Sequence, residues 1–420
     1  MVRAHSARYE KRNRSVCYAH ECKIIILEAI ESISGKKKYS SVLHDSDDKD
    51  MLCVSCPGSK ILNQSYYTYW RDLANGKRTG LIDRLLLLVL APFSLLYSFI
   101  QRLRAILYNT GIFRTYPLPR PVISIGNITV GGTGKTPITA FIARSLLAKG
   151  YKVAVLSRGY GGGLEGQTAV VSDGSTVMMT PKECGDEPYL LASTVPGLMV
   201  VIGTDRYAAG MMAMQQLSPD VFLLDDGFQH LRLQRDMNIL LLDSTTPFGN
   251  GWTLPRGLLR EPRQAALRAD QIIHTRCDGN IMNIPGLDYI PQTSSRHRLS
   301  ILTPLAGGAA VPVEALGSIV AFAGIAQPER FFHDLRMLPL KLAETLPLPD
   351  HAPYSPAVIA AIAAMMRDSG ADYAVTTEKD AVKLAQIQTD LASRILVAHL
   401  DLQLDYSDSL MGDLLNLLQK

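Results

Sequence analysis

A glycine-rich turn between an apolar run and a Gly-Lys-Thr triplet constrains the fold of this chain more than any other feature. The segment 121–137 reads PVISIGNITVGGTGKTP. Its apolar residues 122–125 predict a buried strand, and Thr136 with Pro137 predicts the start of a helix whose N-terminus favours anions. Glycines let backbone amides wrap around phosphate oxygens, as in a phosphate-binding loop. The residues of the predicted loop are Thr129, Val130, Gly131, Gly132, Thr133, Gly134, Lys135 and Thr136.

The lysine and the hydroxyl residue of such a loop have separate tasks. We expect Lys135 to reach the terminal phosphates of a nucleotide and the Thr136 hydroxyl to bind Mg²⁺. The usual pattern has a glycine where this chain has Thr129. A glycine-rich turn without a ligand is the alternative. The phosphate-binding interpretation is favoured because strand, loop, Gly-Lys-Thr triplet and helix follow one another in the required order.

Strand and helix patterns alternate from residue 121 onward, which is typical of a parallel sheet covered by helices on both faces. The predicted fold class is therefore α/β, with a parallel sheet around the phosphate-binding loop. Ligands of such sheets bind beyond the carboxyl ends of the strands, where the charged residues of this chain cluster. Further strands are predicted at 152–156, 199–202, 220–225, 238–243 and 271–275, and helices at 138–149 and 207–216.

The pattern changes after about residue 285. Segment 291–310 is rich in Pro, Ser, Thr and Gly, which predicts a domain boundary or a connecting ribbon. Strands at 318–323 and 373–377, helices at 328–334 and 356–369, and an amphipathic tail helix then predict a second, smaller α/β domain. The expected organisation is a poorly ordered extension at 1–64, an N-terminal membrane-associated helical segment at 65–120, a phosphate-loop core domain at 121–288 and a C-terminal α/β domain at 289–420.

Charge and cysteine content argue against two classes of protein. The 420 residues include 43 basic and 39 acidic side chains, and the net charge of +4 is too small to argue for a nucleic-acid partner. Six cysteines in a chain of this length do not indicate a disulfide scaffold, so we expect an intracellular protein. The pairs Cys17 with Cys22 and Cys53 with Cys56 allow a zinc site in the extension, but poor order is the favoured interpretation there.

The most apolar stretch of the chain is 84–109. Sixteen mostly apolar residues lie between Arg84 and Gln101, fewer than the roughly twenty that a spanning helix requires, and Pro92 is among them. A helix in the membrane interface, with its arginines on anionic headgroups, fits this pattern better than a span. A buried core helix is the alternative.

Two carboxylates end the strand predicted at 220–225. The segment 220–230 reads DVFLLDDGFQH, and an acidic residue at such a strand end supplies a metal contact in phosphate-loop enzymes. We expect Asp225 or Asp226 to hold Mg²⁺, directly or through water, although paired aspartates also cap loops. Gln229 and His230 follow in the same turn and are candidates to orient a nucleotide or substrate.

A second acidic pair, Asp186 and Glu187, precedes a helix-like run. Phosphoryl transfer to a hydroxyl requires a base, and a carboxylate beside a histidine suits that task. Asp186 is the first choice, with His351 as its partner from the second domain, so that domain closure would assemble the site. Taken alone, a histidine in a proline-flanked loop is more often a surface residue.

Arginines also lie in segments predicted near the phosphate end of the sheet. Arg206 follows a strand, and Arg256, Arg260 and Glu261 belong to a proline-bounded loop. Arginines there can stabilise charge on a transferring group, or can be surface salt-bridge partners. Both interpretations stay open for Arg206 and Arg256. Segment 378–380 either reaches the nucleotide base or caps a helix.

Eight ordered motifs resemble one enzyme family. They read GNITVGGTGKTP, LSRGYGG, GDEP, GTDR, DDGFQH, RGLLREP, PDHAPY and TTEKDAVKL. Over about residues 66 to 410 the chain resembles the tetraacyldisaccharide 4′-kinases, the lipid A 4′-kinases of Gram-negative bacteria. The resemblance implies transfer of the γ-phosphate of ATP to the 4′-hydroxyl of tetraacyldisaccharide 1-phosphate, forming lipid IVA. It also implies a peripheral location on the cytoplasmic face of the inner membrane, whose surface would be a partner.

The resemblance assigns roles by motif. It implies that Lys135 and Thr136 serve the phosphates and Mg²⁺, that Asp225 and Asp226 lie at the metal, and that Asp186 is the base supported by His351. The family often has a second histidine where this chain has Ala352, so a role for that residue is absent here. The residues expected at the substrate or at developing charge are Glu187, Arg206, Gln229, Arg260 and Glu261.

An alternative of another class is a membrane-peripheral phosphate-loop NTPase that acts as a nucleotide-dependent switch. A switch hydrolyses nucleotide without a lipid acceptor, whereas a kinase transfers the phosphate to it. The motifs beyond the phosphate loop favour the kinase.

Overall fold

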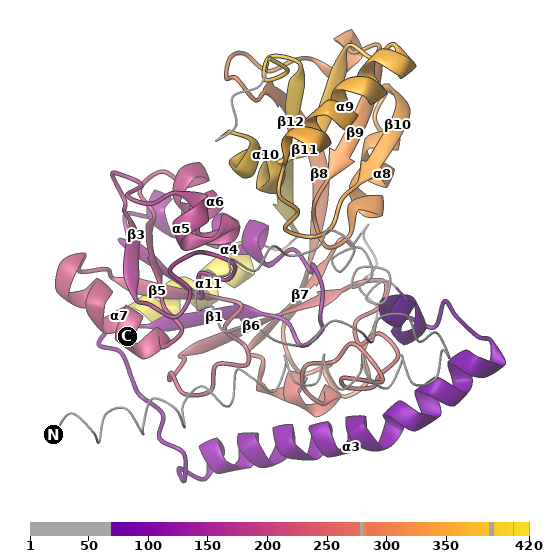
Figure 1. The fold of residues 1–420 in the computed structure, drawn as a ribbon. Helices are drawn as coiled ribbons and strands as arrows, with labels where there is room; N and C mark the ends of the chain where they lie inside the picture. Colours follow the sequence, from indigo (N-terminus) through magenta and orange to yellow (C-terminus); the bar gives the residue numbers. More distant parts are fainter. Residues whose placement is uncertain (1–68, 278–280, 282, 386–389, 406, 420) are drawn as a thin grey trace, which may run out of the picture. The chain divides into compact units, whose positions relative to one another are not determined.

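The structure is a computed structural model that describes residues 69–277, 281, 283–385, 390–405 and 407–419. The extension at 1–64 and its four cysteines, and with them the alternative of a zinc site, lie outside the described residues. Figure 1 shows the arrangement of the described helices and strands.

The phosphate-loop half of the molecule is built on a mostly parallel sheet. Its strands are β1 (Val122–Gly126), β2 (Val153–Ser157), β3 (Ala169–Asp173), β4 (Met199–Ile202), β5 (Val221–Asp225), β6 (Met237–Asp243) and β7 (Gln271–Thr275). Strand β1 lies between β5 and β6 and is parallel to both, whereas β3 pairs with β4 in the antiparallel direction. The mixed α/β class predicted from the sequence is confirmed.

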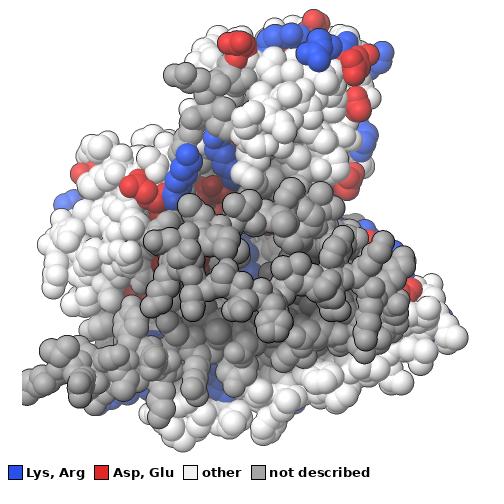
Figure 2. Space-filling model, viewed as in Figure 1, with Lys and Arg blue, Asp and Glu red and all other residues white. Residues whose placement is uncertain are grey.

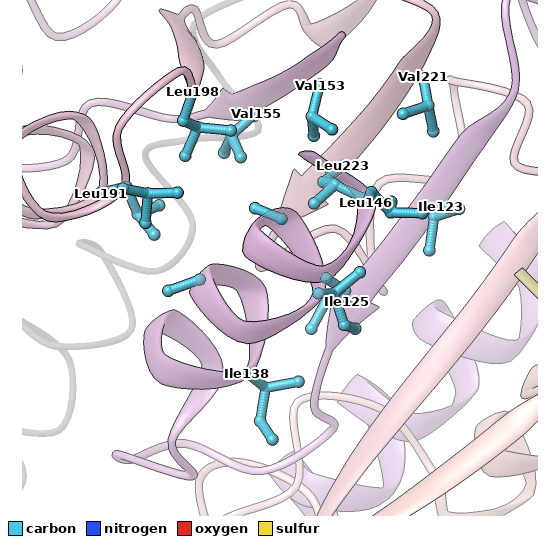
Figure 3. Close-up of a cluster of buried hydrophobic side chains, with 14 of the residues drawn as sticks. Ile123, Ile125, Ile138, Leu146, Val153, Val155, Leu191, Leu198, Val221 and Leu223 are labelled. Atoms are coloured by element: carbon cyan, nitrogen blue, oxygen red, sulfur yellow. The ribbon is translucent and has the colours of Figure 1, made fainter. Parts of the chain in front are cut away.

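Helices cover both faces of this half. They are α4 (Lys135–Ala148), α5 (Pro181–Cys184), α6 (Asp186–Thr194), α7 (Arg206–Gln216), the 3-10 helix η1 (Arg263–Arg268) and α11 (Ser407–Leu418). Side chains of a strand alternate between faces, so Ile123 and Ile125 pack with Ile138 of α4 while Val122 packs with Ala209 of α7. Figure 3 shows the first of these clusters between α4 and the sheet.

The C-terminal half extends the same sheet. Its elements are β8 (Gln292–Pro304), η2 (Val313–Ala315), β9 (Ser318–Ala323), α8 (Pro328–Arg336), β10 (Lys341–Pro347), α9 (Pro356–Ser369), β11 (Tyr373–Thr377), α10 (Glu378–Leu384) and β12 (Ile395–Leu404). The described strands form one twelve-stranded sheet in the order β10-β9-β11-β12-β8-β7-β6-β1-β5-β2-β4-β3.

Strand β8 is the connection between the two halves. Its first residues pair with β7 in parallel, and its remainder pairs with β12 in the antiparallel direction. The ribbon expected at 291–310 is therefore a long strand shared by both halves (Figure 1). Beyond β12, Leu410 and Leu414 of α11 are buried in the core of the phosphate-loop half. We therefore propose that the C-terminal domain ends before α11.

The exposed helix α3 (Leu81–Asn109) is the apolar segment identified in the sequence. It is continuous over 29 residues, with Pro92 inside it, and so is longer than the sixteen-residue apolar run. By length and composition alone it is apolar enough to cross a membrane, with a mean hydropathy of 1.7 over an 18-residue window. Only 11% of that window is buried, so the alternative of a buried core helix is wrong.

The side of α3 that faces the protein carries polar contacts. The hydroxyls of Ser94 and Ser98 hydrogen-bond with Thr253 Oγ1 at 2.9 and 2.8 Å, and Tyr97 donates to the carbonyl of Arg260 at 3.0 Å. These positions share one helical face. The large apolar side chains that remain exposed elsewhere on α3 include Leu81, Leu85, Leu88, Phe99 and Ile106. In Figure 2, the part of α3 visible at the lower right is mostly uncharged.

Candidate active site

The predicted phosphate-binding loop lies between β1 and α4, near the centre of the sheet. Gly134 precedes α4 in the left-handed region with φ of 79°, and Gly131 has φ of 126°. A side chain at either position would strain the backbone. Helix α4 begins at Lys135, one residue before the start predicted at Thr136 and Pro137, and its first amides are available to an anion.

A short antiparallel contact holds the loop from the side. The Val130 N–H donates to the Leu258 carbonyl at 2.8 Å, and the Arg260 N–H donates to the Ile128 carbonyl at 2.7 Å. This backbone pairing was not predicted. It brings Arg260, the second arginine of the RGLLREP motif, beside the loop.

Two cations of the site converge on Asp226. Its carboxylate accepts hydrogen bonds from Arg260 Nη1 at 3.0 and 2.8 Å, and Lys135 Nζ lies 3.7 Å from it. Lys135 also donates to Asn127 Oδ1 at 3.4 Å. Burial opposes the charge on Asp226, but Arg260 and Lys135 outweigh burial and lower its pKa to about 2. Asp226 is therefore ionised at neutral pH.

The neighbouring carboxylate, Asp225, has a different environment. It is 3% exposed and receives one long hydrogen bond, 3.5 Å from Thr139 Oγ1. Within the described part of the chain, no basic side chain lies within 4.0 Å of it. Burial raises the pKa of Asp225, and the charges of Glu187 and Asp226 raise it further. The charged form of this carboxylate is therefore disfavoured by its surroundings, and a bound cation would stabilise it.

The candidate base Asp186 begins α6 and meets residues of the C-terminal half. His351 Nδ1 lies 3.0 Å from Asp186 Oδ2, and Lys383 Nζ lies 3.3 Å from the same oxygen. Burial opposes the charge on Asp186, but the hydrogen bond from His351 and the charge of Lys383 lower its pKa below the usual range. The structure thus brings together Asp186 and the histidine predicted as its partner.

A second lysine determines which ring nitrogen of His351 carries the proton. Lys379 Nζ lies 3.2 Å from His351 Nε2, and 3.3 Å from carboxylate oxygens of both Glu187 and Asp350. An ammonium group only donates, so Nε2 accepts and the ring proton is on Nδ1, which donates to Asp186. Basic and acidic side chains gather between α6 and α10 in Figure 2. Neither lysine was predicted from the sequence as a partner of the candidate base or of its histidine.

Three other candidates make contacts with the backbone or with side chains near the phosphate-binding loop and the strand ends. Gln229 Nε2 donates to the Asn127 carbonyl at 2.8 Å, and Glu261 is 1% exposed and paired with Arg268 at 2.6 Å. Arg206 is 5% exposed and donates to the carbonyl of Gly203, so it is not a surface salt-bridge residue.

Arg256 and His230, which were also candidates from the sequence, have other environments. Arg256 stacks on the Trp252 ring, with its guanidinium carbon 3.6 Å from the ring centroid. His230 Nε2 is buried and has no hydrogen-bond partner among the described residues. Burial, with a contribution from Arg206, lowers the pKa of His230 to about 3.

Comparison with known proteins identifies close relatives. The family model of tetraacyldisaccharide-1-P 4′-kinase matches residues 86–419. A protein of Pelobacter propionicus named tetraacyldisaccharide 4′-kinase is 60% identical over 362 residues, covering 86% of this chain and 100% of the relative. The protein of that name from Geobacter metallireducens is 54% identical, over 74% of this chain and 92% of its own.

A solved structure is also similar. The crystal structure of LpxK from Aquifex aeolicus in complex with ATP shares 33% identity with this chain at a TM-score of 0.68. The match covers 79% of this chain and 99% of that one.

The low pKa of His230 predicts a dependence of stability on pH. In the unfolded chain a histidine binds its proton below about pH 6.5, but folded His230 does so only near pH 3. Lowering the pH from about 6.5 to 5 therefore favours unfolding, by up to about 1.4 kcal/mol per pH unit for this group. His230→Gln should reduce that slope in urea unfolding curves. The exposed His333, changed to Gln, is the control that keeps the slope; equal slopes for both variants would contradict the assignment.

Proposed function

The chain belongs to the tetraacyldisaccharide 4′-kinase family, and from that premise we propose how its residues act. Its function is the ATP-dependent phosphorylation of the 4′-hydroxyl of tetraacyldisaccharide 1-phosphate in lipid A biosynthesis. Membership in a kinase family favours transfer to a lipid acceptor over the nucleotide-dependent switch considered from the sequence.

We propose that the loop from Thr129 to Thr136 binds the phosphates of ATP. Its glycines and the first turn of α4 offer amides to oxygen atoms, and Lys135 brings a positive charge to the same place. Arg260 would stabilise charge that develops on the transferring group, since its guanidinium lies beside the loop and shares Asp226 with Lys135. Gln229, Glu261 and Arg206 would hold this arrangement.

We propose that Thr136, Asp225 and Asp226 hold Mg²⁺. Oxygen ligands suit this ion, which commonly binds through one or two carboxylates together with substrate phosphates. A buried carboxylate with a raised pKa and a single long hydrogen bond, as Asp225 has, fits that requirement. When bound, Mg²⁺ neutralises charge on the phosphates of the nucleotide. Among the described residues no cluster of three or more His, Cys, Asp or Glu side chains forms a closed metal cage, and this mode of binding requires none.

We propose that Asp186 accepts the proton of the 4′-hydroxyl as its oxygen bonds to the γ-phosphorus, while the bond from that phosphorus to the β–γ bridging oxygen breaks and ADP leaves. The carboxylate is ionised at neutral pH because its pKa is low, so it can accept a proton. His351 orients it through the Nδ1–H hydrogen bond, and Lys379 keeps the imidazole in that tautomer. Glu187 would hold Lys379 in place.

One observation carries this assignment of a single site. Glu187, next to the candidate base, acts electrostatically on Asp225 and on Arg260. This influence supports a single site that contains both the carboxylates proposed for the metal and the carboxylate proposed as the base. Such an arrangement permits the metal ligands and the base to act on one bound triphosphate.

Asp186→Asn should lower turnover while leaving nucleotide binding intact. Loss of a positioned base costs about 10²–10⁴-fold in rate, whereas the loop and Lys135 are unchanged. The measurement is transfer of label from γ-labelled ATP to tetraacyldisaccharide 1-phosphate, read by thin-layer chromatography, with ATP affinity measured in parallel. The exposed Asp368, changed to Asn, serves as the matched control. Turnover near that of the unchanged enzyme would remove Asp186 as the base.

We propose that α3 lies on the inner-membrane surface rather than across it. Its polar face is occupied by hydrogen bonds to the protein, which leaves one side for lipid. The apolar side is exposed, as at Leu88, where 67% of the residue is accessible. A lipid substrate held in the bilayer would then be presented to the site. Because ATP is a cytoplasmic metabolite, the cytoplasmic face is the expected location.

Replacing Leu85, Leu88 and Phe99 together by Gln should abolish binding to vesicles. Each apolar side chain removed from lipid loses about 1.5 kcal/mol or more, so three lose roughly a thousand-fold in affinity. Folding should persist because these side chains are exposed. The measurement is co-sedimentation with anionic phospholipid vesicles, with a thermal melt of each protein.

The matched control replaces three exposed apolar residues outside α3, namely Met178, Ile301 and Met337. That variant should sediment like the unchanged protein. Equal binding by the α3 variant would refute membrane attachment through α3.

A further inference from the structure

A buried aspartate that the sequence analysis did not single out joins two arginines from different parts of the chain. Asp243, at the end of β6, is 7% exposed. Its Oδ2 atom accepts from Arg276 Nη1 at 3.2 Å and from Arg330 Nη1 at 2.5 Å. Its Oδ1 atom accepts from the N–H and the hydroxyl of Thr245 at 3.0 and 2.6 Å. Asp243 is therefore fully engaged and holds both guanidinium groups in place.

Besides Asp243, Arg276 also contacts the phosphate-binding loop. Its Nη2 atom donates to the carbonyl of Gly132 at 3.0 Å. In a trans peptide the carbonyl and the next N–H point in opposite directions, so this bond turns the Thr133 N–H away from Arg276. The guanidinium thus fixes the orientation of one of the amides available to phosphate oxygens.

The backbone at Arg276 supports a specific role for this side chain. Its φ is 58°, in the left-handed region that residues other than glycine seldom adopt. Such backbone conformations persist where surrounding contacts impose them, and they are concentrated at functional sites. Here the conformation lets one side chain at the end of β7 reach both Asp243 and the loop.

Arg330 belongs to α8 and connects this cluster to the C-terminal half. The connection before α8 also covers the loop, because a methyl group added to Gly132 would lie 3.6 Å from the Ala326 Cβ. On another side, a methyl group added to Gly134 would lie 2.6 Å from the ring of His297 in β8. The loop is thus approached on two sides by the half of the molecule that supplies His351.

We propose that Arg276 is a positioning residue that sets the nucleotide-binding conformation of the loop, and that Arg330, through the shared Asp243, couples the C-terminal half to it. This inference rests on the proposed function of the loop in binding ATP. Its consequence is reciprocal: a change that releases Arg330 weakens ATP binding, and ATP binding favours the position of the C-terminal half.

Conservative substitutions separate this role from a merely structural one. Arg276→Lys keeps a charge beside Asp243, but a single ammonium cannot reproduce the two contacts made by separate guanidinium nitrogens. It should weaken ATP binding about ten-fold or more and raise the KM for ATP, with little change in kcat at saturating ATP. Arg330 uses one nitrogen in its bond to Asp243, so Arg330→Lys should bind ATP normally whereas Arg330→Gln should bind it about three-fold more weakly.

The experiment is calorimetric titration of each full-length variant with magnesium ATP, together with steady-state kinetics and thermal melts. Arg336→Gln, an exposed arginine on the same helix as Arg330, is the matched control and should match the unchanged protein. An Arg276→Lys protein that melts normally and binds ATP with unchanged affinity overturns the inference. A lower melting temperature with an unchanged KM also overturns it. Failure of the unchanged protein to bind ATP would instead refute the proposed function.

Discussion

The ion pairs of Asp226 with Lys135 and Arg260 are the interaction on which the rest of the site depends. Lysine and arginine would repel one another beside the loop without a carboxylate between them. Asp226 follows β5, and Arg260 pairs with the loop through its backbone and accepts a hydrogen bond from Tyr97 of α3. One partly buried charge cluster therefore connects the central strands, the phosphate-binding loop and the apolar helix.

The long strand β8 determines how the second half of the chain reaches this cluster. Because β8 pairs with β7 at its start and with β12 afterwards, both halves share one sheet. The C-terminal half then contributes His351 and Lys383 to the candidate base and Arg330 to Asp243. Each of these contacts joins a side chain of the C-terminal half to a carboxylate of the phosphate-loop half. The position of the C-terminal half therefore affects the chemistry proposed for the phosphate-loop half.

Local patterns in the sequence predicted the parts of the structure that depend on neighbouring residues. The loop, β1, β4, β7 and the carboxylates that end β5 follow from apolar runs bounded by glycine or aspartate. Strands β3, β10 and β12 were missed. Strand β10 alternates only weakly and is largely exposed, and the latter part of β12, in which leucines alternate with polar residues, pairs with β8. Their pairing depends on residues far away in the sequence.

The contacts between distant segments were the least predictable part of the site. The chemistry of a carboxylate beside a histidine and the family resemblance predicted that Asp186 and His351 act together, but nothing in the spacing of Lys383 indicated that it meets the same carboxylate oxygen. Asp243, Arg276 and Arg330 belong to three separate elements and form no motif. In contrast, the exposed face of α3 followed from its composition, because an apolar run interrupted by arginines is typical of a helix at an interface.

Calorimetric titration of the unchanged protein and of Lys135→Ala with ATP, with and without Mg²⁺, is the most direct test of the account. If the loop and Lys135 hold the nucleotide, the protein binds one nucleotide per chain, requires Mg²⁺, and loses at least about ten-fold in affinity when the ammonium is removed. Equal affinity of Lys135→Ala and the unchanged protein would contradict the central claim that this loop and its lysine hold the nucleotide.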